Sequence, residues 1–294
     1  MKMLPLFLIS IMINITNLSS SDFLKHPPIL VGDKFGFTEG PVWINDKEIF
    51  LFSDIPNNKI YSVNLQGQVN VFDNNSGYAN GLAVTEEGTI FYARHDRNIS
   101  KRNFESKSEI IASHFKNKRL NSPNDLVISK DGSIWFTDPP FGIQGYGPEK
   151  AEEEQPVRGV YQIKGKEIIL RDDSFNLPNG IAFSPDESFI YVADTADGTV
   201  YRFENKNGKL SNKEAFAKLE SGNQNPIVDG IAVDEYGNLY ITGRGGIGIF
   251  SQSGKQLDFI SIDSNHISNI GIGGKKNNML MVTAVNKVLI FEIK

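Results

Sequence analysis

Six short phrases along the chain carry an oxygen-bearing side chain at their second position and continue into an apolar run. The phrases are TEGPVWI, ANGLAVT, PNDLVIS, PNGIAFS, VDGIAVD and SNIGIGG. Their oxygen-bearing positions are Glu39, Asn80, Asn124, Asn179, Asp229 and Asn269. Two carboxylates and four amides suit a hard divalent cation such as Ca²⁺. If the six positions meet, they predict a metal-binding or polar active channel; taken singly, Asn-Gly and Asp-Gly are ordinary turn residues.

The spacing of the phrases indicates how these side chains would meet. Successive phrases lie 41, 44, 55, 50 and 40 residues apart, and periods of this size are typical of propeller blades or solenoids. Each interval holds short apolar, β-branched or aromatic runs bounded by Gly, Asn, Asp or Pro, as at 48–54, 189–195 and 238–243. We therefore predict an all-β, six-bladed β-propeller in which the first strand of each blade lines a central channel.

The two ends of the ring and one long interval complete this prediction. After Asn269 the chain has room for three strands, so PPILVGD near Ile29 is expected to supply the fourth. That pairing would close the ring between the N- and C-terminal strands and cover an exposed sheet edge. The third interval contains an irregular polar insert at 142–158, a surface loop in which Tyr146 is a candidate lid residue.

Composition limits the available chemistry. The chain has no cysteine, which excludes disulfides, thiolate metal ligands and cysteine nucleophiles, and it has only four histidines. A metal site must therefore depend largely on oxygen ligands, which favours Ca²⁺ or Mg²⁺ over Zn²⁺. The formal net charge of −5 argues against a nucleic-acid partner, because such proteins carry a basic patch or stripe.

The N-terminus has the order of an export signal. Lys2 precedes a nearly unbroken apolar run from Leu4 to Ile15, and small polar residues follow at 19–21. The run is too short to span a bilayer. We predict a signal peptide at 1–21, a single propeller domain at 22–294, export to the periplasm or the medium, and no membrane span after removal of the signal. The alternative is a buried N-terminal element.

Longer phrases resemble a known family. FTEGPVW, RLNSPNDLV, DGSIWFTDPPFGI, LPNGIAFSPDE and VDGIAVDEYGNLYI are similar to the gluconolactonase, senescence-marker-protein and luciferin-regenerating-enzyme family. The resemblance runs from about Phe37 to Phe250 and continues more weakly to the C-terminus, and RLNSPND with FTDPPFG looks most like bacterial gluconolactonases. It implies a six-bladed propeller with a metal-dependent lactonase site on its axis.

The same resemblance implies roles for four of the six positions. Glu39, Asn179 and Asp229 match direct metal ligands, and Asn124 matches an asparagine at the metal or the substrate. Asp229 also matches the residue proposed to transfer a proton, so Asp229 and Asn124 are the expected catalytic residues. The expected cofactor is one divalent ion bound by Glu39, Asn124, Asn179 and Asp229. Members often use Ca²⁺, while some accept Zn²⁺, Mg²⁺ or Mn²⁺.

Further residues are candidates for substrate binding beside Asn124. Asn80 matches an asparagine near the substrate in the family that the chain resembles. His95 follows the second strand of its blade and can reach the channel mouth, or it serves only as a hydrogen-bonding histidine. Asp138 either faces the cavity or caps a turn. Arg119 either contacts the hydroxyls or the carboxylate of a substrate or remains a solvated surface residue.

The expected reaction is hydrolysis of a small sugar-type lactone to its hydroxy acid. Two alternatives remain open: a calcium-dependent phosphotriesterase or arylesterase, and a non-catalytic calcium- or ligand-binding propeller. A propeller that only binds sugars or proteins would not need the Glu39 and Asp229 pair. The sequence contains no GxSxG, HExxH or P-loop pattern that would indicate another catalytic class.

Overall fold

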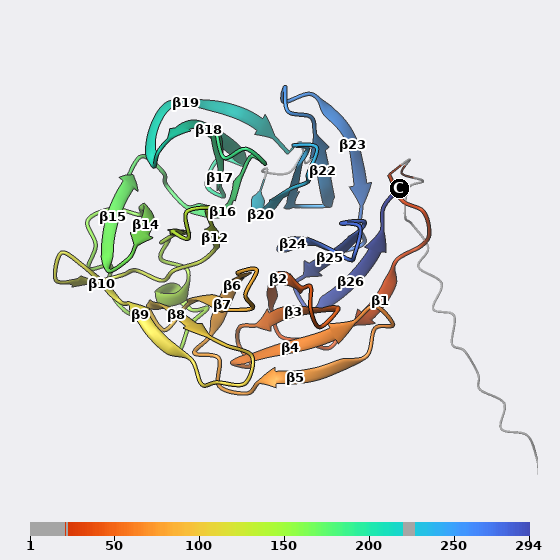
Figure 1. The fold of residues 1–294 in the computed structure, drawn as a ribbon, viewed down its shortest axis with the longest axis horizontal. Helices are drawn as coiled ribbons and strands as arrows, with labels where there is room; N and C mark the ends of the chain where they lie inside the picture. The colour runs from red at the N-terminus through yellow and green to blue at the C-terminus, as the bar shows by residue number, and fades with distance from the viewer. Residues whose placement is uncertain (1–20, 22, 220–226) are drawn as a thin grey trace, which may run out of the picture.

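The computed structural model describes residues 21, 23–219 and 227–294, so the predicted signal peptide lies outside the described residues except for Ser21. The described chain forms six four-stranded antiparallel sheets, a two-stranded hairpin and one short 3₁₀ helix. Figure 1 shows the sheets arranged as blades around a central axis, with the first strand of each blade nearest that axis. The predicted all-β, six-bladed propeller is confirmed.

The first three blades run outward from the axis in chain order. Blade 1 contains β2 (Thr38–Ile44), β3 (Ile49–Asp54), β4 (Lys59–Asn64) and β5 (Val69–Asp73). Blade 2 contains β6 (Ala79–Val84), β7 (Ile90–Arg94), β8 (Asn98–Arg102) and β9 (Glu109–Ala112). Blade 3 contains β12 (Leu126–Ile128), β13 (Ile134–Thr137), β14 (Val160–Lys164) and β15 (Glu167–Asp172). The hairpin β10 (His114–Phe115) and β11 (Lys118–Arg119) lies between blades 2 and 3 in the sequence.

Blades 4 and 5 repeat the pattern, and blade 6 departs from it only in its outermost strand. Blade 4 contains β16 (Pro178–Phe183), β17 (Phe189–Asp194), β18 (Thr199–Lys206) and β19 (Lys209–Lys218). Blade 5 contains β20 (Val228–Val233), β21 (Leu239–Gly243), β22 (Gly246–Phe250) and β23 (Gln256–Ser261). Blade 6 contains β24 (Asn269–Gly273), β25 (Met279–Ala284) and β26 (Lys287–Glu292), and β1 (Ile29–Gly32) completes it.

The ring closes by pairing the two ends of the chain, as the sequence predicts. β1 runs antiparallel to β26, with Ile29 opposite Ile290 and Leu30 opposite Leu289. A further bridge joins Leu24 to Ile293. The N-terminal strand therefore covers the outer edge of blade 6 and removes an open ladder of backbone donors and acceptors.

The core lies between neighbouring blades. The described residues form six buried apolar clusters, each built mainly from the facing sides of two adjacent blades. In β3, Phe50 and Phe52 pack toward blade 6 while Leu51 packs toward blade 2, and all three are fully buried. This alternation follows from the two-residue period of a strand, and both faces are apolar because both are covered.

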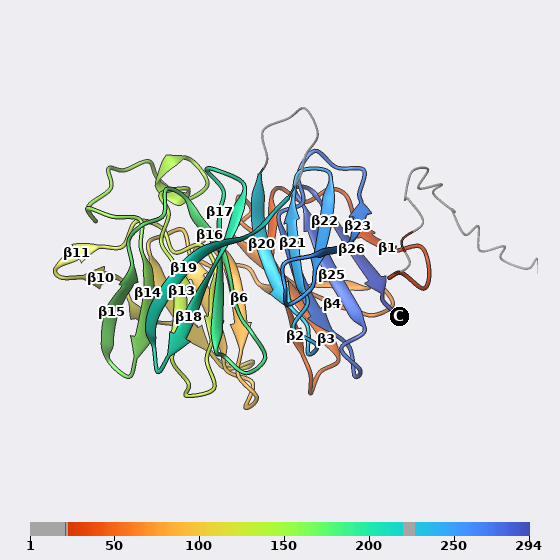
Figure 2. The same cartoon turned by 90° about the horizontal axis from the view of Figure 1, so that it is seen from above.

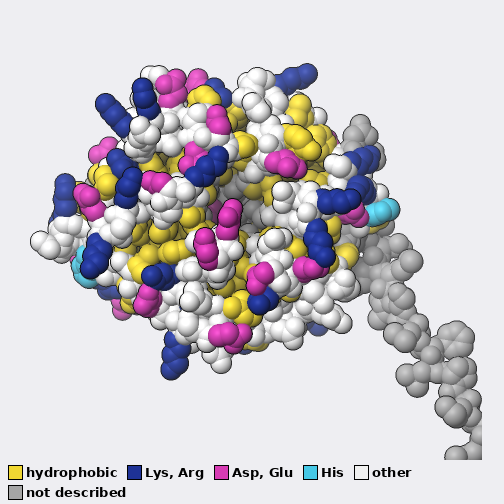
Figure 3. Space-filling view, viewed as in Figure 1, with side chains coloured by type: hydrophobic (Ala, Val, Ile, Leu, Met, Phe, Trp, Pro, Cys, Tyr) yellow, Lys and Arg dark blue, Asp and Glu magenta, His cyan; other side chains and the backbone are white. Residues whose placement is uncertain are grey.

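The connection between β13 and β14 is the long insert predicted from the sequence. It includes the 3₁₀ helix η1 (Gly142–Gln144). Figure 2 shows this connection projecting beyond the strand ends on one side of the ring. No helix in the described ranges is long and apolar enough to cross a membrane. On the face seen in Figure 3, acidic and basic side chains are interspersed.

Candidate active site

A cavity of about 410 Å³ lies at one mouth of the central channel, on the side where the insert projects. Five of the six predicted ring residues line it, and we call these five the cavity floor: Glu39, Asn80, Asn124, Asn179 and Asp229. His95 also lines the cavity. The structure therefore brings together the four predicted metal ligands and two of the predicted substrate-binding residues, although they come from five different blades.

Local irregularities of the inner strands point the floor side chains into the cavity. In blades 1, 2, 4 and 5 the pairing between the first and second strands shifts by one residue at the repeated phrase. Such a β-bulge redirects a side chain that would otherwise follow the regular alternation. Asn80, Asn179 and Asp229 lie within these bulges, and Glu39 lies at the start of one. In blade 3, Asn124 precedes β12 altogether.

The sixth ring position, Asn269, lies differently. β24 pairs with β25 without any shift, and Asn269 does not line the cavity. It borders a hollow toward the other end of the channel and donates from Nδ2 to Oε2 of Glu39 at 2.9 Å. A Cβ added at Gly230 would lie 2.1 Å from Cγ of Asn269, so only glycine permits this close approach. Asn269 therefore supports the floor from below.

Hydroxyl groups fix the inner strands relative to one another. Ser53 Oγ donates to the carbonyl of Asn80, and Thr137 Oγ1 donates to the carbonyl of Asn179, both at 2.8 Å. Thr195 Oγ1 likewise donates to the carbonyl of Val228 at 2.9 Å. Each bond links the end of one blade's second strand to the first strand of another blade. The floor is thus a preorganised ring rather than a set of independent loops.

The two floor carboxylates are buried, and neither pairs with a lysine or arginine of the described residues. Glu39 is 3% exposed and Asp229 is 6% exposed. Burial, followed by the charge of Asp229, raises the pKa of Glu39 well above its usual range. Burial also raises the pKa of Asp229, and its hydrogen bond with His266 only partly offsets this effect. A bound cation would relieve both penalties.

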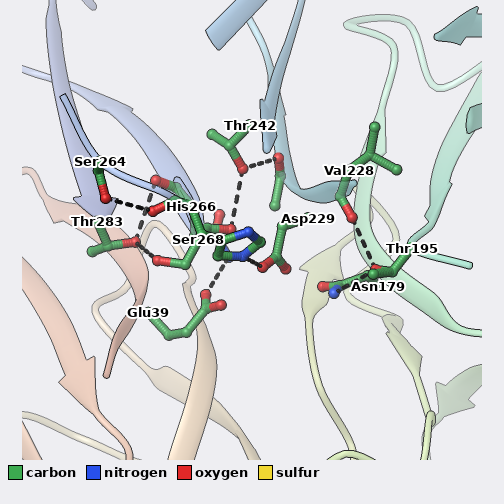
Figure 4. A network of polar contacts seen from close by, with 12 residues as sticks. Glu39, Asn179, Thr195, Val228, Asp229, Thr242, Ser264, His266, Ser268 and Thr283 are labelled. Carbon is green, nitrogen blue, oxygen red and sulfur yellow. Dashed lines mark hydrogen bonds and ion pairs between the residues drawn. The ribbon is translucent and has the colours of Figure 1, made fainter. Parts of the chain in front are cut away.

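His266 is the partner of Asp229. Its Nε2 lies 2.5 Å from Oδ2 of Asp229, and Figure 4 shows the imidazole beside that carboxylate, with Glu39 and Asn179 turned toward the same space. Burial disfavours the charged imidazole, but the hydrogen bond and the negative charge of Asp229 together outweigh burial and raise the pKa of His266. The histidine therefore holds the carboxylate in one orientation and stabilises its negative charge.

His95 is a neutral hydrogen-bonding bridge. Its Nδ1 lies 3.1 Å from the carbonyl oxygen of Tyr146, which can only accept, so Nδ1 carries the proton. Nε2 then accepts from Nδ2 of Asn80, also at 3.1 Å. Burial lowers the pKa of His95 to about 4, which keeps the ring neutral. This arrangement leaves Oδ1 of Asn80 buried without a partner among the described residues.

Aromatic side chains form one side of the cavity mouth. The ring of Tyr146 meets Phe37 edge-on at 5.4 Å, and Phe37 lies 6.3 Å from the ring of His266. Phe141 from the insert also lines the cavity. We call Phe37, Phe141 and Tyr146 the aromatic roof. The insert is anchored beneath by Ser122, whose Oγ accepts from the backbone N–H of Gly142 at 2.8 Å.

Asp138 does not line the cavity, contrary to its predicted role in substrate binding. It is fully buried, and its Oδ2 accepts from the backbone N–H of Asn121 at 2.8 Å. Asp54 and Asp194 end the second strands of their own blades and likewise accept backbone N–H groups of the loops that enter those blades. The recurrence shows that Asp138 fixes a loop, which was the alternative that the sequence left open.

Arg119 also lies outside the cavity lining. Its guanidinium donates to the carbonyl of Asp96 at 3.4 Å and lies 3.8 Å from Glu149, with the side chain 38% exposed. Because β10 and β11 form a separate hairpin, Arg119 borders the insert rather than the floor. The predicted substrate contact is therefore corrected to a surface contact with the insert.

Sequence reasoning missed several residues that line the cavity, chiefly His266, Arg244 and Phe37. His266 and Phe37 lie in loops that lead into inner strands, and Arg244 lies in the hairpin between β21 and β22. No phrase repeats from blade to blade at any of these places. For His266 and Phe37, only the position close to a repeated phrase could have indicated a role, and Arg244 is not close to any such phrase. His266 lies three residues before Asn269, and Phe37 lies two residues before Glu39.

The floor has the donor set that a divalent cation needs. The observed hydrogen bonds occupy Oε2 of Glu39 and Nδ2 of Asn179, and the side chain of Asn124 makes none with a described residue. One oxygen on each of these three residues is therefore available, beside the carboxylate of Asp229. Among the described residues, no group of three or more His, Cys, Asp or Glu side chains lies close enough together to hold a metal ion. A cation here would therefore depend on the amides as well as the carboxylates, which suits Ca²⁺.

Known proteins share this architecture. The family model described as SMP-30/Gluconolactonase/LRE-like region matches residues 37–286. A gluconolactonase of Zymomonas mobilis is 30% identical over 290 residues, covering 90% of this chain and 80% of that protein. Regucalcin of Bos taurus is 25% identical, covering 83% and 82% respectively.

A solved gluconolactonase from Xanthomonas campestris superposes with a TM-score of 0.85 at 28% identity, covering 93% of this chain and 91% of the other. A calcium-binding regucalcin from Agrobacterium tumefaciens has a TM-score of 0.77 at 16% identity, covering 91% and 95%, and this likeness shows the fold alone. The family match spans blades 1 to 5 and the first two strands of blade 6, β24 and β25. The chain belongs to the SMP-30/gluconolactonase/LRE-like family.

Proposed function

We propose that this protein is a metal-dependent hydrolase that opens a sugar-type lactone to its hydroxy acid. The observation that carries the proposal is the convergence of Glu39, Asn124, Asn179 and Asp229 on one cavity, with His266 on Asp229. The gluconolactonases among its relatives support the reaction class. The cofactor in this proposal is a single divalent ion, with Ca²⁺ as the first candidate and Zn²⁺, Mg²⁺ and Mn²⁺ as alternatives.

The floor residues have different roles in the proposed reaction. A divalent ion bound by Glu39, Asn124, Asn179 and Asp229 would supply Lewis-acid polarisation of the ester carbonyl. Asp229, oriented by His266, accepts the proton of the attacking water. The amide of Asn124 is free to donate to an oxygen of the lactone ester as negative charge develops on it.

The remaining cavity residues hold the sugar. Oδ1 of Asn80 is a buried acceptor without a partner among the described residues, and a substrate hydroxyl can donate to it. Neutral His95 fixes that amide, because its Nε2 occupies Nδ2 of Asn80. The aromatic roof covers an apolar face of the ring and reduces the access of bulk water.

An assay with two substrates and two matched variants tests this proposal. The wild-type protein should hydrolyse D-glucono-1,5-lactone above the spontaneous rate and much faster than the phosphotriester paraoxon. Asp229→Asn should lower kcat by about 10²–10⁴-fold, the usual contribution of a positioned general base. Asp46→Asn, at an exposed site outside the cavity, is the matched control. Near-normal lactone turnover by Asp229→Asn would contradict the role of Asp229 as proton acceptor. Preferential paraoxon hydrolysis would favour the phosphotriesterase alternative.

Export through the signal at residues 1–21 is part of the same proposal, supported by the order of charged, apolar and small residues there. N-terminal sequencing of the protein recovered outside the cytoplasm should show that the signal has been removed. A mature protein that begins at residue 1 would contradict it.

A further inference from the structure

Arg244 is the only lysine or arginine among the described residues that line the cavity. It lies in the hairpin between β21 and β22, where Gly243 pairs with Gly246 and leaves Arg244 and Gly245 as the two loop residues. Gly245 has a φ of +84°, a conformation that a two-residue turn commonly requires and that glycine adopts without strain. The shortness of this hairpin places a cation directly on the cavity wall.

The equivalent hairpins of other blades also contribute one wall residue each. Blade 1 supplies Ile55, blade 2 supplies His95 and blade 4 supplies Thr195. None of these carries a charge at neutral pH, because burial keeps His95 uncharged. Arg244 is therefore the charged member of an otherwise neutral set, and we call these four residues the cavity wall.

The guanidinium of Arg244 has no hydrogen bond or ion pair with any described residue. Each of the other seven arginines donates to a carboxylate, carbonyl, hydroxyl or amide oxygen. Arg244 is half-buried, and it pairs with neither floor carboxylate. Five N–H donors on a partly desolvated side chain thus have no acceptor among the described residues, and a ligand that enters the cavity can supply one.

The neighbours of Arg244 are consistent with a role in ligand binding. Arg244 and His266 line the same cavity above the floor. Asn265, next to His266, also lines the cavity and adds a neutral amide. The floor carboxylates are engaged elsewhere: Asp229 with His266, and Glu39 with Asn269. No acidic side chain in the described cavity lining is left to neutralise Arg244.

We propose that Arg244 binds an anionic group of the substrate, remote from the lactone carbonyl, so that the preferred substrates are lactones that carry a carboxylate or a phosphate. A planar guanidinium forms paired, charge-assisted hydrogen bonds with either group. This inference rests on the proposed lactonase function. It specifies the class of lactone, because a neutral aldonolactone offers no anionic acceptor to the guanidinium N–H groups of Arg244.

A binding experiment tests Arg244 independently of hydrolysis. The probes are D-glucose, D-glucuronate and D-glucose 6-phosphate, which differ only in the group at C6 and contain no lactone. The wild-type protein should bind at least one anionic probe about 10–100-fold more tightly than D-glucose, as expected for hydrogen bonds to a charged group. Comparison of the two anionic probes shows whether carboxylate or phosphate is preferred.

Three variants make this comparison decisive. Arg244→Gln should bind all three probes about equally, whereas Lys164→Gln, which removes an exposed charge outside the cavity, should keep the wild-type preference. Arg244→Lys should keep part of the preference, because its charge remains while the planar fork is lost. Equal binding of the three probes by the wild-type protein would overturn the inference, and so would an anion preference that survives in Arg244→Gln.

Kinetics then connect Arg244 with the reaction. Arg244→Gln should raise KM for 6-phospho-D-glucono-1,5-lactone by about 10–100-fold and leave KM for the neutral lactone within about twofold. An equal loss on both substrates would contradict a role in anion recognition. If the wild-type protein hydrolyses neither lactone, the proposed function fails, and the binding experiment still decides the role of Arg244.

Discussion

The cavity floor and the residues above it come from different parts of the blades. The floor is formed by the starts of the first strands, which carry the same type of side chain in successive blades. The cavity wall and the aromatic roof are formed by hairpins, the insert and the loops that enter the blades, and their residue types differ from one blade to the next. The comparison suggests that the repeated part supplies the chemistry and the variable part selects the substrate.

His266 links the two regions, because it comes from a loop and contacts a floor residue. His266→Gln should lower kcat for the lactone by about 10–100-fold, the usual cost of losing a group that orients a catalytic or metal-binding side chain. KM should change little, because the floor and roof contacts with the substrate remain. Steady-state kinetics that separate kcat from KM check this expectation.

The matched control is His114→Gln, at an exposed site in the β10–β11 hairpin, which should behave as the wild type. An unchanged kcat in His266→Gln would show that Asp229 does not need its partner. A rise in KM with an unaltered kcat would instead assign His266 to the substrate-binding region.

The aromatic roof should affect binding more than chemistry. Tyr146→Ala removes the edge-on contact with Phe37, and aromatic contacts of this kind contribute about 0.5–1.5 kcal/mol. KM should therefore rise by about 2–10-fold with kcat nearly unchanged. Tyr236→Ala, at a residue that is 72% exposed, is the control. A large fall in kcat would show that the roof takes part in the reaction itself.

Asp138 should have the smallest effect on activity and a clear effect on stability. Burial raises the pKa of Asp138 to about 7, above the value of an unfolded aspartate. As the pH rises from about 4 to 7, the unfolded state ionises while the folded state retains the proton, so this group costs stability progressively. Asp138→Asn lacks this cost, and its stability relative to the wild type should increase over the same range.

Urea unfolding of both proteins at pH 5 and pH 8 measures that difference, and lactone turnover should stay within about twofold of the wild type, as for most sites away from reacting groups. A stability difference that is the same at both pH values would contradict the raised pKa. Loss of turnover without loss of stability would restore Asp138 to the substrate site.

The repeated phrases predicted the blades, the ring closure and the floor because they report a structural period. The same period wrongly suggested that Asn269 belongs to the cavity floor. No bulge in β24 turns its side chain into the cavity. The sequence also contained a signal that was not used: Asp54 and Asp194 end the second strands of their blades, Asp138 directly follows that of blade 3, and all three accept loop N–H groups. That recurrence could have identified Asp138 as structural.

The residues above the floor could not be predicted in this way. The equivalent positions of the other blades carry residues of other types than His266 and Arg244, and the place of these two side chains depends on loop conformations rather than on strand alternation. Arg119 was wrongly predicted to contact the substrate because it lies shortly before Asn124 in the sequence. In the structure the β10–β11 hairpin holds Arg119 against the insert.

The most direct test of the central claim is lactone hydrolysis by metal-stripped protein, with Ca²⁺, Zn²⁺, Mg²⁺ and Mn²⁺ restored in turn. We expect the stripped protein to fall to the spontaneous rate and at least one ion to restore turnover. Glu39→Gln, which removes one of the two floor carboxylates, should require at least about 10–100-fold more of that ion. Full turnover by protein shown by elemental analysis to be metal-free would contradict a metal-dependent floor.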